Sequence, residues 1–102
     1  MQITRAIIAL ILMASASVGV AADGLIAVKS QYSAEETIDR LEQQVRQRGL
    51  TVFARIDHAA GAAKVGETLR PTMLLVFGNP KGGTPFMKCE QTVGIDLPLR
   101  AL

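Results

Sequence analysis

Few side chains in this sequence are suited to chemistry. The chain has one histidine, His58, which directly follows Asp57, and one cysteine, Cys89. An imidazole can ligate a metal or transfer a proton near neutral pH, and beside a thiol it can act as the base that activates a nucleophile. A metal site needs three or four convergent ligands, so one histidine is a narrow basis for it. The preferred interpretation is structural: His58 fixes a turn, and Cys89 packs as a small apolar side chain.

Residues 78–85, Gly-Asn-Pro-Lys-Gly-Gly-Thr-Pro, form a second candidate. Backbone amides, a hydroxyl and Lys81 precede an expected helix that begins with Thr84 as N-cap and Pro85 in its first turn. A helix N-terminus of this kind suits an anion. The spacing does not match a P-loop or a dinucleotide-binding loop, and a tight strand-to-helix turn also requires Gly and Pro. The plain turn is favoured.

The candidate residues are expected to meet in one pocket formed by loops at the strand ends. The predicted pocket is lined by Asp57, His58, Arg70, Asn79 and Thr84. We expect it to hold a small anionic or metal-linked ligand; the cofactor and the metal stay unknown. For Arg70, and for Arg55 on the preceding strand, a surface ion pair is the default alternative. Cys89 is the candidate for a reactive thiol.

The first 22 residues have the pattern of a signal peptide. Arg5 supplies a positive start, residues 6–13 are apolar, and Val20-Ala21-Ala22 fits the small-residue rule for cleavage after Ala22. The apolar stretch is short for a membrane span, so cleavage is favoured over a retained anchor. We therefore expect a periplasmic or secreted protein without a stable membrane anchor, with its domain at residues 23–102.

Charge and cysteine content limit the possible partners. Removal of residues 1–22 leaves 80 residues with ten basic and nine acidic side chains, a net charge of +1. This balance is too weak to indicate a nucleic-acid partner. Small exported domains often depend on disulfides, and a chain with one cysteine cannot form one internally. Stability must come from the core, or from a core that a second copy completes.

The spacing of apolar residues predicts a small α+β domain. Ser33 and Glu36 form a capping box at the start of an amphipathic helix, which Gly49 ends in a left-handed conformation. Four extended segments are expected, at residues 24–29, 50–57, 73–77 and 99–102. The run 73–77 is apolar throughout, so it should lie centrally in the sheet. In the segment 50–57, residues 50, 52, 54 and 56 should face the helix. Residues 86–93 should form about two helical turns.

Several segments, in the same order, resemble the DUF302 family. They are residues 53–62, 69–72, 77–80, 83–85 and 94–99. The resemblance implies a small antiparallel sheet with helices packed on one face, similar to the TATA-box-binding-protein-like (TBP-like) fold, and frequent dimerisation. It also implies that the Asp57-His58 pair belongs to a family motif. Members usually continue beyond the equivalent of residues 97–99 with further strands and a helix, so the domain is expected to be truncated at its C-terminus.

These observations favour a non-enzymatic module that binds a small ligand or another protein and acts as a dimer. One alternative is a thiol-dependent sulfur or redox activity in the periplasm, with Cys89 as nucleophile and His58 as base. A second alternative is a truncated copy without function. The same observations favour a protein without enzymatic activity over an enzyme.

Overall fold

The computed structural model describes residues 24–102 as an α+β fold, as the sequence predicts. The elements are α2 (Ala34–Gln47), β1 (Thr51–Asp57), α3 (His58–Lys64), β2 (Met73–Gly78), α4 (Pro80–Cys89), the 3₁₀ helix η1 (Gln91–Asp96) and β3 (Leu99–Ala101). The expected signal peptide at residues 1–22 lies outside the described residues.

The three strands form one antiparallel sheet in the order β1–β2–β3. β2 is therefore central, and its Leu75 is fully buried, with 0% of its surface exposed. This confirms the prediction that the apolar run at residues 73–77 lies in the middle of the sheet. The expected extended segment at the end of the sequence is confirmed as β3.

α2 covers one face of this sheet and supplies most of the core. Its Ile38 and Val45 are buried with Leu75 of β2, and partly buried apolar residues pack around them, namely Leu41, Leu50, Val52, Met73 and Phe77. The Ser33 hydroxyl accepts the Glu36 amide at 3.2 Å. Gly49 has φ +74° just after the helix end, so both predicted helix boundaries are confirmed.

A β-bulge at Phe53 changes which β1 side chains face the helix. Val52 and Ala54 pair with consecutive residues of β2, 77 and 76, so Phe53 is an extra residue in the ladder. Side chains alternate between the two faces of a sheet, and one extra residue reverses the alternation that follows it. The prediction that residues 50, 52, 54 and 56 share the helix-facing side is therefore wrong after Val52.

Beyond the bulge, Arg55 lies opposite Leu75 and so shares the face that α2 covers. Ala54 and Ile56 turn to the other side. We call that side the open face; its apolar side chains are Phe53, Ala54, Ile56, Leu74 and Val76. The open face is thus apolar, and α2 does not cover it.

Residues 24–29 do not form the expected strand. They have no regular structure, and Leu25, Ile26 and Val28 are 61%, 85% and 84% exposed. A strand needs a neighbour that satisfies its backbone groups, and these residues pair with none of the three strands. Ser30 is held near α2, because its hydroxyl lies 2.6 Å from that of Thr37.

α4 begins earlier than predicted. Asn79 is its N-cap, with the side-chain oxygen accepting the Lys81 amide at 3.0 Å, and Pro80 is its first residue. Thr84 and Pro85 lie inside the helix, so the prediction of Thr84 as the cap is wrong. Asn followed by Pro is itself a start signal and comes first along the chain. The helix ends at Cys89, and η1 follows where residues 90–93 were expected to continue it.

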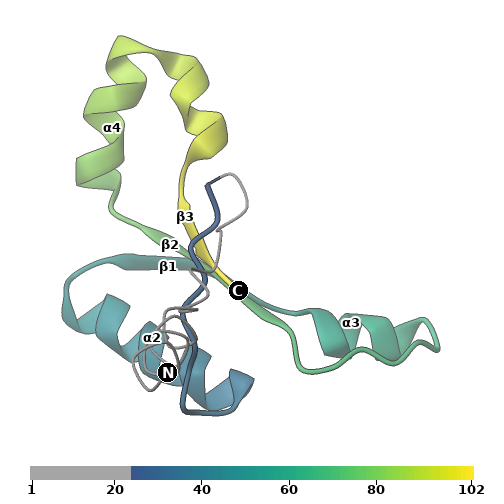
Figure 1. Ribbon diagram of the computed structural model, residues 1–102. Helices are drawn as coiled ribbons and strands as arrows, with labels where there is room; N and C mark the ends of the chain where they lie inside the picture. Colours follow the sequence, from purple (N-terminus) through teal and green to yellow (C-terminus); the bar gives the residue numbers. More distant parts are fainter. Residues whose placement is uncertain (1–23) are drawn as a thin grey trace, which may run out of the picture.

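Two parts of the chain extend away from the sheet (Figure 1). α3 and the loop after it form an arm on one side, and α4 with η1 forms a lobe on another. The main partner of α4 is η1, not the sheet. The expectation that the helices pack together on one face therefore holds for α2 alone.

Candidate functional site

The five residues predicted to share one pocket lie at opposite ends of the β1–β2 pair. Asp57 is opposite Met73 at one end, whereas Gly78, which precedes Asn79, is opposite Thr51 at the other. The intervening strand is six residues long, about 20 Å at ~3.3 Å per residue. Residues 57, 58 and 70 are therefore separated from residues 79 and 84. The prediction of one pocket is wrong.

At the first end, Asp57 and His58 shape the entry into the arm. The Asp57 carboxylate accepts the Ala60 amide at 2.9 Å and caps α3. The His58 backbone amide donates to the Thr72 carbonyl at 2.9 Å, and the Thr72 hydroxyl donates to the Arg70 carbonyl at 2.9 Å. The bond from His58 to Thr72 joins the start and the end of the arm at its base, and the other two are local. Their role in the structure is to hold a turn, which agrees with the preferred interpretation of His58.

A metal site has little support at this end. Residues 24–102 contain no cluster of three or more His, Cys, Asp or Glu side chains placed to hold a metal ion. The Asp57 carboxylate is already engaged as a cap, and His58 is exposed. A two-residue set of this kind falls short of the three or four ligands that a protein metal site uses.

At the second end, the amides that were expected to bind an anion are already used. The Lys81 amide donates to the Asn79 side chain, and the Gly82 and Gly83 amides both donate to the Asn79 carbonyl at 2.9 Å. Pro80 has no amide hydrogen. The start of α4 therefore has no free amide in its first four residues, and the structure favours the plain turn.

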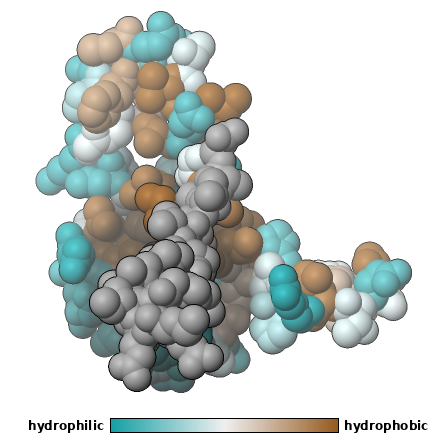
Figure 2. All heavy atoms as spheres, viewed as in Figure 1, coloured by the Kyte–Doolittle hydropathy of each residue, from teal (hydrophilic) through white to brown (hydrophobic). Residues whose placement is uncertain are grey.

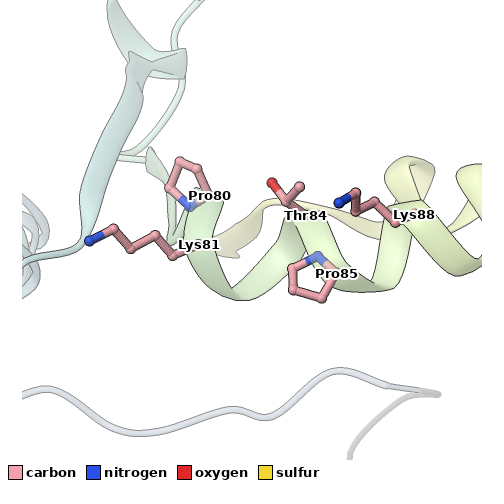
Figure 3. Close-up of a pocket in the computed structure, with 5 residues that line it drawn as sticks. All are labelled: Pro80, Lys81, Thr84, Pro85 and Lys88. Carbon is pink, nitrogen blue, oxygen red and sulfur yellow. The ribbon is translucent and has the colours of Figure 1, made fainter.

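A shallow depression of about 560 Å³ lies along α4. Figure 3 shows its lining residues, Pro80, Lys81, Thr84, Pro85 and Lys88. The ammonium group of Lys88 extends toward Thr84, whereas Lys81 extends away from it along the helix. The two cations therefore do not converge on one point, as a tight anion site would require.

A larger hollow of about 790 Å³ lies between the α4–η1 lobe and the end of the sheet. It is lined by Phe53, Val76, Gly78, Asn79, Pro80, Gly82, Gly83, Thr84, Phe86, Met87, Gly94, Leu97, Pro98 and Leu99. None of these side chains is ionisable, so the hollow suits apolar groups. Figure 2 shows apolar side chains at the surface of this lobe. The sequence analysis did not predict this hollow; the available signals are its glycines and the scattered apolar residues 86, 87 and 97.

Two glycines allow close contacts within the α4–η1 lobe. A Cβ atom at Gly83 would lie 3.3 Å from Leu97 Cδ1, and one at Gly94 would lie 3.3 Å from Met87 Sδ. Both distances are shorter than ordinary carbon contacts. A larger residue at either position would require the Leu97 or Met87 side chain to shift by a few tenths of an ångström, so the glycines permit the present close packing.

Cys89 is exposed at the end of α4, so the prediction that it packs in the core is wrong. α4 leaves the sheet at the end opposite to α3, where His58 lies, and Figure 1 shows the two helices on different sides of the molecule. A thiol and its base must come within hydrogen-bond reach. Within one chain, Cys89 and His58 do not form such a pair.

The strongest electrostatic feature joins α2 to β1. Arg55 Nη1 donates to Asp39 Oδ1 at 2.6 Å and to Glu42 Oε2 at 3.3 Å. Glu42 also accepts Arg46 Nη2 at 2.7 Å. The hydrogen bond from Arg46, followed by that from Arg55, lowers the pKa of Glu42. The hydrogen bond to Asp39 raises the pKa of Arg55. This network holds the sheet to its helix.

Comparison with known families shows which family the chain belongs to. The family model described as "Domain of unknown function DUF302" matches residues 26–102. The chain belongs to the DUF302 family. A crystal structure of an uncharacterised conserved DUF302 protein from Bacillus stearothermophilus is similar, with a TM-score of 0.64 and 26% sequence identity over 72% of this chain and 58% of that one. The α+β fold of a DUF302 domain is thereby confirmed.

Curated relatives of this DUF302 domain are much longer proteins. A protein named fluoride-specific ion channel FluC 1, from Brucella suis biovar 1 (strain 1330), is 48% identical over 79 residues, which are 78% of this chain and 31% of that protein. Fluoride-specific ion channel FluC 2 from Brucella melitensis biotype 1 (strain ATCC 23456 / CCUG 17765 / NCTC 10094 / 16M) has the same identity over 29% of its length. The chain thus spans about a third of these relatives.

In this DUF302 domain, no helix within residues 24–102 is long and apolar enough to cross a membrane. All the predicted site residues lie inside the matched segment 26–102. The family description names no activity, and the surfaces of the domain are the features that bear on its function.

Proposed function

We propose that this DUF302 domain is an exported, non-enzymatic interaction module that acts as a dimer. The observation that carries the proposal is the small size of its core. In the described part of the chain, three apolar side chains are buried, whereas thirteen large apolar side chains are exposed. Each square ångström of apolar surface removed from water contributes about 25 cal/mol, so a partner that covers these side chains would stabilise the fold substantially.

The distribution of these exposed side chains supports association rather than catalysis. Ten of the thirteen lie on the open face, in the α4–η1 lobe, in residues 24–29 and beside β3; the other three are Tyr32, Val65 and Leu69. Contiguous exposed apolar surface is typical of protein interfaces. The candidate catalytic groups, in contrast, are separated from one another or engaged in caps.

A small exported domain also has few other means of stabilisation. Domains of this size bury a modest fraction of their surface and often add disulfides. This chain has a single cysteine, which leaves association as the available route. The relatives support the idea of a module, because a similar region occurs there within a chain about three times longer.

The proposal is tested on the protein recovered from the periplasm of an expressing cell. Intact mass reports whether residues 1–22 have been removed. Light scattering should give the mass of a dimer, and the unfolding temperature should rise with protein concentration, because association stabilises the folded state by mass action. A folded monomer with a concentration-independent unfolding temperature would contradict the proposal.

A second candidate comes from the names of the curated relatives. Their fluoride-channel names, together with 48% identity over 79 residues, support a role for this domain beside a fluoride channel as its protein partner. We favour a partner over a fluoride-binding site because Lys81 and Lys88 do not converge and the α4 amides are occupied.

This candidate is tested by co-purification with a tagged fluoride channel from the same organism, and by growth of a strain lacking the domain in fluoride. Co-purification and lower fluoride tolerance are expected. A ¹⁹F NMR titration of the purified domain provides the contrast, with no line broadening expected. Absence of both co-purification and a growth effect would remove the candidate.

A further inference from the structure

Residues Leu25–Lys29 have a sequence typical of a strand but belong to no sheet in the structure. They are mostly apolar, and Ile26 and Val28 are β-branched, a residue type that favours strands. In the single chain, these two side chains are 85% and 84% exposed. The segment ends next to Ser30, which the Thr37 hydroxyl holds at 2.6 Å near the start of α2. It is thus an apolar segment without regular structure, attached to a fixed point of the domain.

Among the described residues, 24–102, the sheet has one regular edge that no strand covers. β3 pairs with β2 on one side only, so its other side presents free backbone donors and acceptors. The outer edge of β1 is different, because the bulge at Phe53 interrupts it and bulges discourage pairing. Within residues 24–102, β3 is therefore the edge best suited to accept another strand.

The side chains of β3 match the segment. Leu99 lies opposite Phe77, so it is on the side of the sheet that faces α2, and it is 55% exposed. Ala101 shares that side, whereas Arg100 points to the open face with Val76. The two β3 residues on the α2 side, Leu99 and Ala101, are thus apolar, as are Ile26 and Val28 of the segment.

We propose that Leu25–Lys29 of one copy adds to the outer edge of β3 of a second copy, and reciprocally, with Ala27 opposite Arg100. Ile26 and Val28 then lie beside Leu99 and Ala101 on the α2 side, and the Arg100 stem passes over Ala27. This register is possible for either strand direction, because it is symmetric about Ala27. The inference rests on the dimer proposed above and names the surface that forms it.

The size of this exchange agrees with a stable dimer. A five-residue strand that adds to an edge and its receptor together lose several hundred square ångströms of accessible surface. Two reciprocal exchanges double this area and bring it toward the roughly 1,200–2,000 Å² that a specific protein interface buries. A second copy is the occupant because, within one chain, the segment lies off the sheet with its apolar side chains in solvent.

The test uses the full chain with Cys89→Ser, recovered from the periplasm, and a pair of cysteines at Ala27 and Arg100. Directly opposed residues of paired strands have Cβ atoms about 4.5–5.5 Å apart, close enough for a disulfide after small adjustments. Mild oxidation should give a covalent dimer. The matched control replaces Ala63, an exposed alanine of α3, in place of Arg100 and should cross-link much less.

A second measurement uses Ile26→Asp, which should raise the dimer dissociation constant about tenfold or more. Val65→Asp, at an exposed position of the arm, is its control and should leave the constant unchanged. Circular dichroism checks that both variants keep the fold.

A disulfide that forms within one chain would overturn the exchange between copies. A dimer that persists with no Ala27–Arg100 cross-link and no effect of Ile26→Asp would overturn this inference and leave the proposed dimer intact. A monomer at every concentration would overturn both.

Discussion

Arg55 on β1 and Asp39 on α2, sixteen residues apart in the sequence, are joined by a 2.6 Å contact between Arg55 Nη1 and Asp39 Oδ1. This contact exists because the bulge at Phe53 turns Arg55 to the side of the sheet that α2 covers. The guanidinium also reaches Glu42, so one side chain of the sheet connects to two successive turns of the helix.

The stability of the domain should depend on pH through Glu42. Hydrogen bonds from Arg46 and Arg55 lower the pKa of Glu42 below its ordinary value of 4.5 in the folded state. Between the folded and unfolded pKa values the unfolded chain binds more protons, so stability rises with pH in that range. The contribution is complete above pH 4.5 and is lost as the pH falls through the lower folded pKa.

Urea unfolding of the Glu42→Gln variant over this acid range measures the effect. The variant should show a shallower loss of stability on acidification than the unmodified protein. The size is small, because ion pairs with exposed members contribute little. Glu35→Gln on the same helix is the control and should leave the slope unchanged; equal slopes for Glu42→Gln and the unmodified protein would contradict the assignment.

Leu75→Ala should be among the most destabilising single changes. Leu75 is fully buried at the centre of the sheet, and removal of a buried leucine side chain costs about 2–5 kcal/mol. Chemical unfolding measures the free energy of unfolding. The protein concentration is held fixed, because association also stabilises the folded state. Val65→Ala, at an exposed site, should change it by about 0.5 kcal/mol or less. Similar losses for both variants would indicate that the core lies elsewhere.

Asn79→Ala and Thr84→Ala distinguish the two possible starts of α4. Asn79 caps the helix through its side chain, so its loss should cost about 1 kcal/mol. Thr84 lies inside the helix, where alanine is the better helix former, so its replacement should be neutral or slightly stabilising. Thermal unfolding of the two variants at one concentration is the measurement. A larger loss of stability for Thr84→Ala than for Asn79→Ala would indicate that Thr84 is the cap.

The Cys89 thiol should react in the folded protein. Its exposed position at the end of α4 predicts full titration by a thiol reagent without denaturant, at a rate close to that of the unfolded chain. Cys89→Ser should not alter the unfolding temperature of the reduced protein. A thiol that reacts only after denaturation would show that the residue is buried, as the sequence pattern had indicated.

Local patterns predicted the parts of the fold that local interactions determine. The capping residue Ser33, the apolar stripe of α2 and the left-handed Gly49 all depend on neighbours a few residues away. The central position of β2 followed from its continuous apolar run. The bulge at Phe53 could not be predicted in this way, because it depends on the alignment of β1 with a partner strand.

The prediction of one pocket was wrong because of the directions of the strands. Asp57 is the last residue of β1, and Asn79 directly follows the last residue of β2. Both therefore lie at the carboxyl end of a strand. The carboxyl ends of neighbouring strands lie together only when the strands are parallel. β1 and β2 are antiparallel, so their carboxyl ends lie at opposite edges of the sheet. The start of α4, in contrast, was predictable: the Asn79-Pro80 pair carries the same cap signal as Thr84-Pro85, one and a half turns earlier.

The arm formed by α3 and the following loop offers a place for a reporter. It meets the rest of the domain chiefly through β2, and one hydrogen bond, from the His58 amide to the Thr72 carbonyl, joins its two ends at the base. Exposed loop tips of this kind accept inserted sequence readily. A fluorescent protein or an epitope inserted between Glu67 and Thr68 would therefore label the domain in living cells with the sheet and both proposed contact surfaces left unmodified.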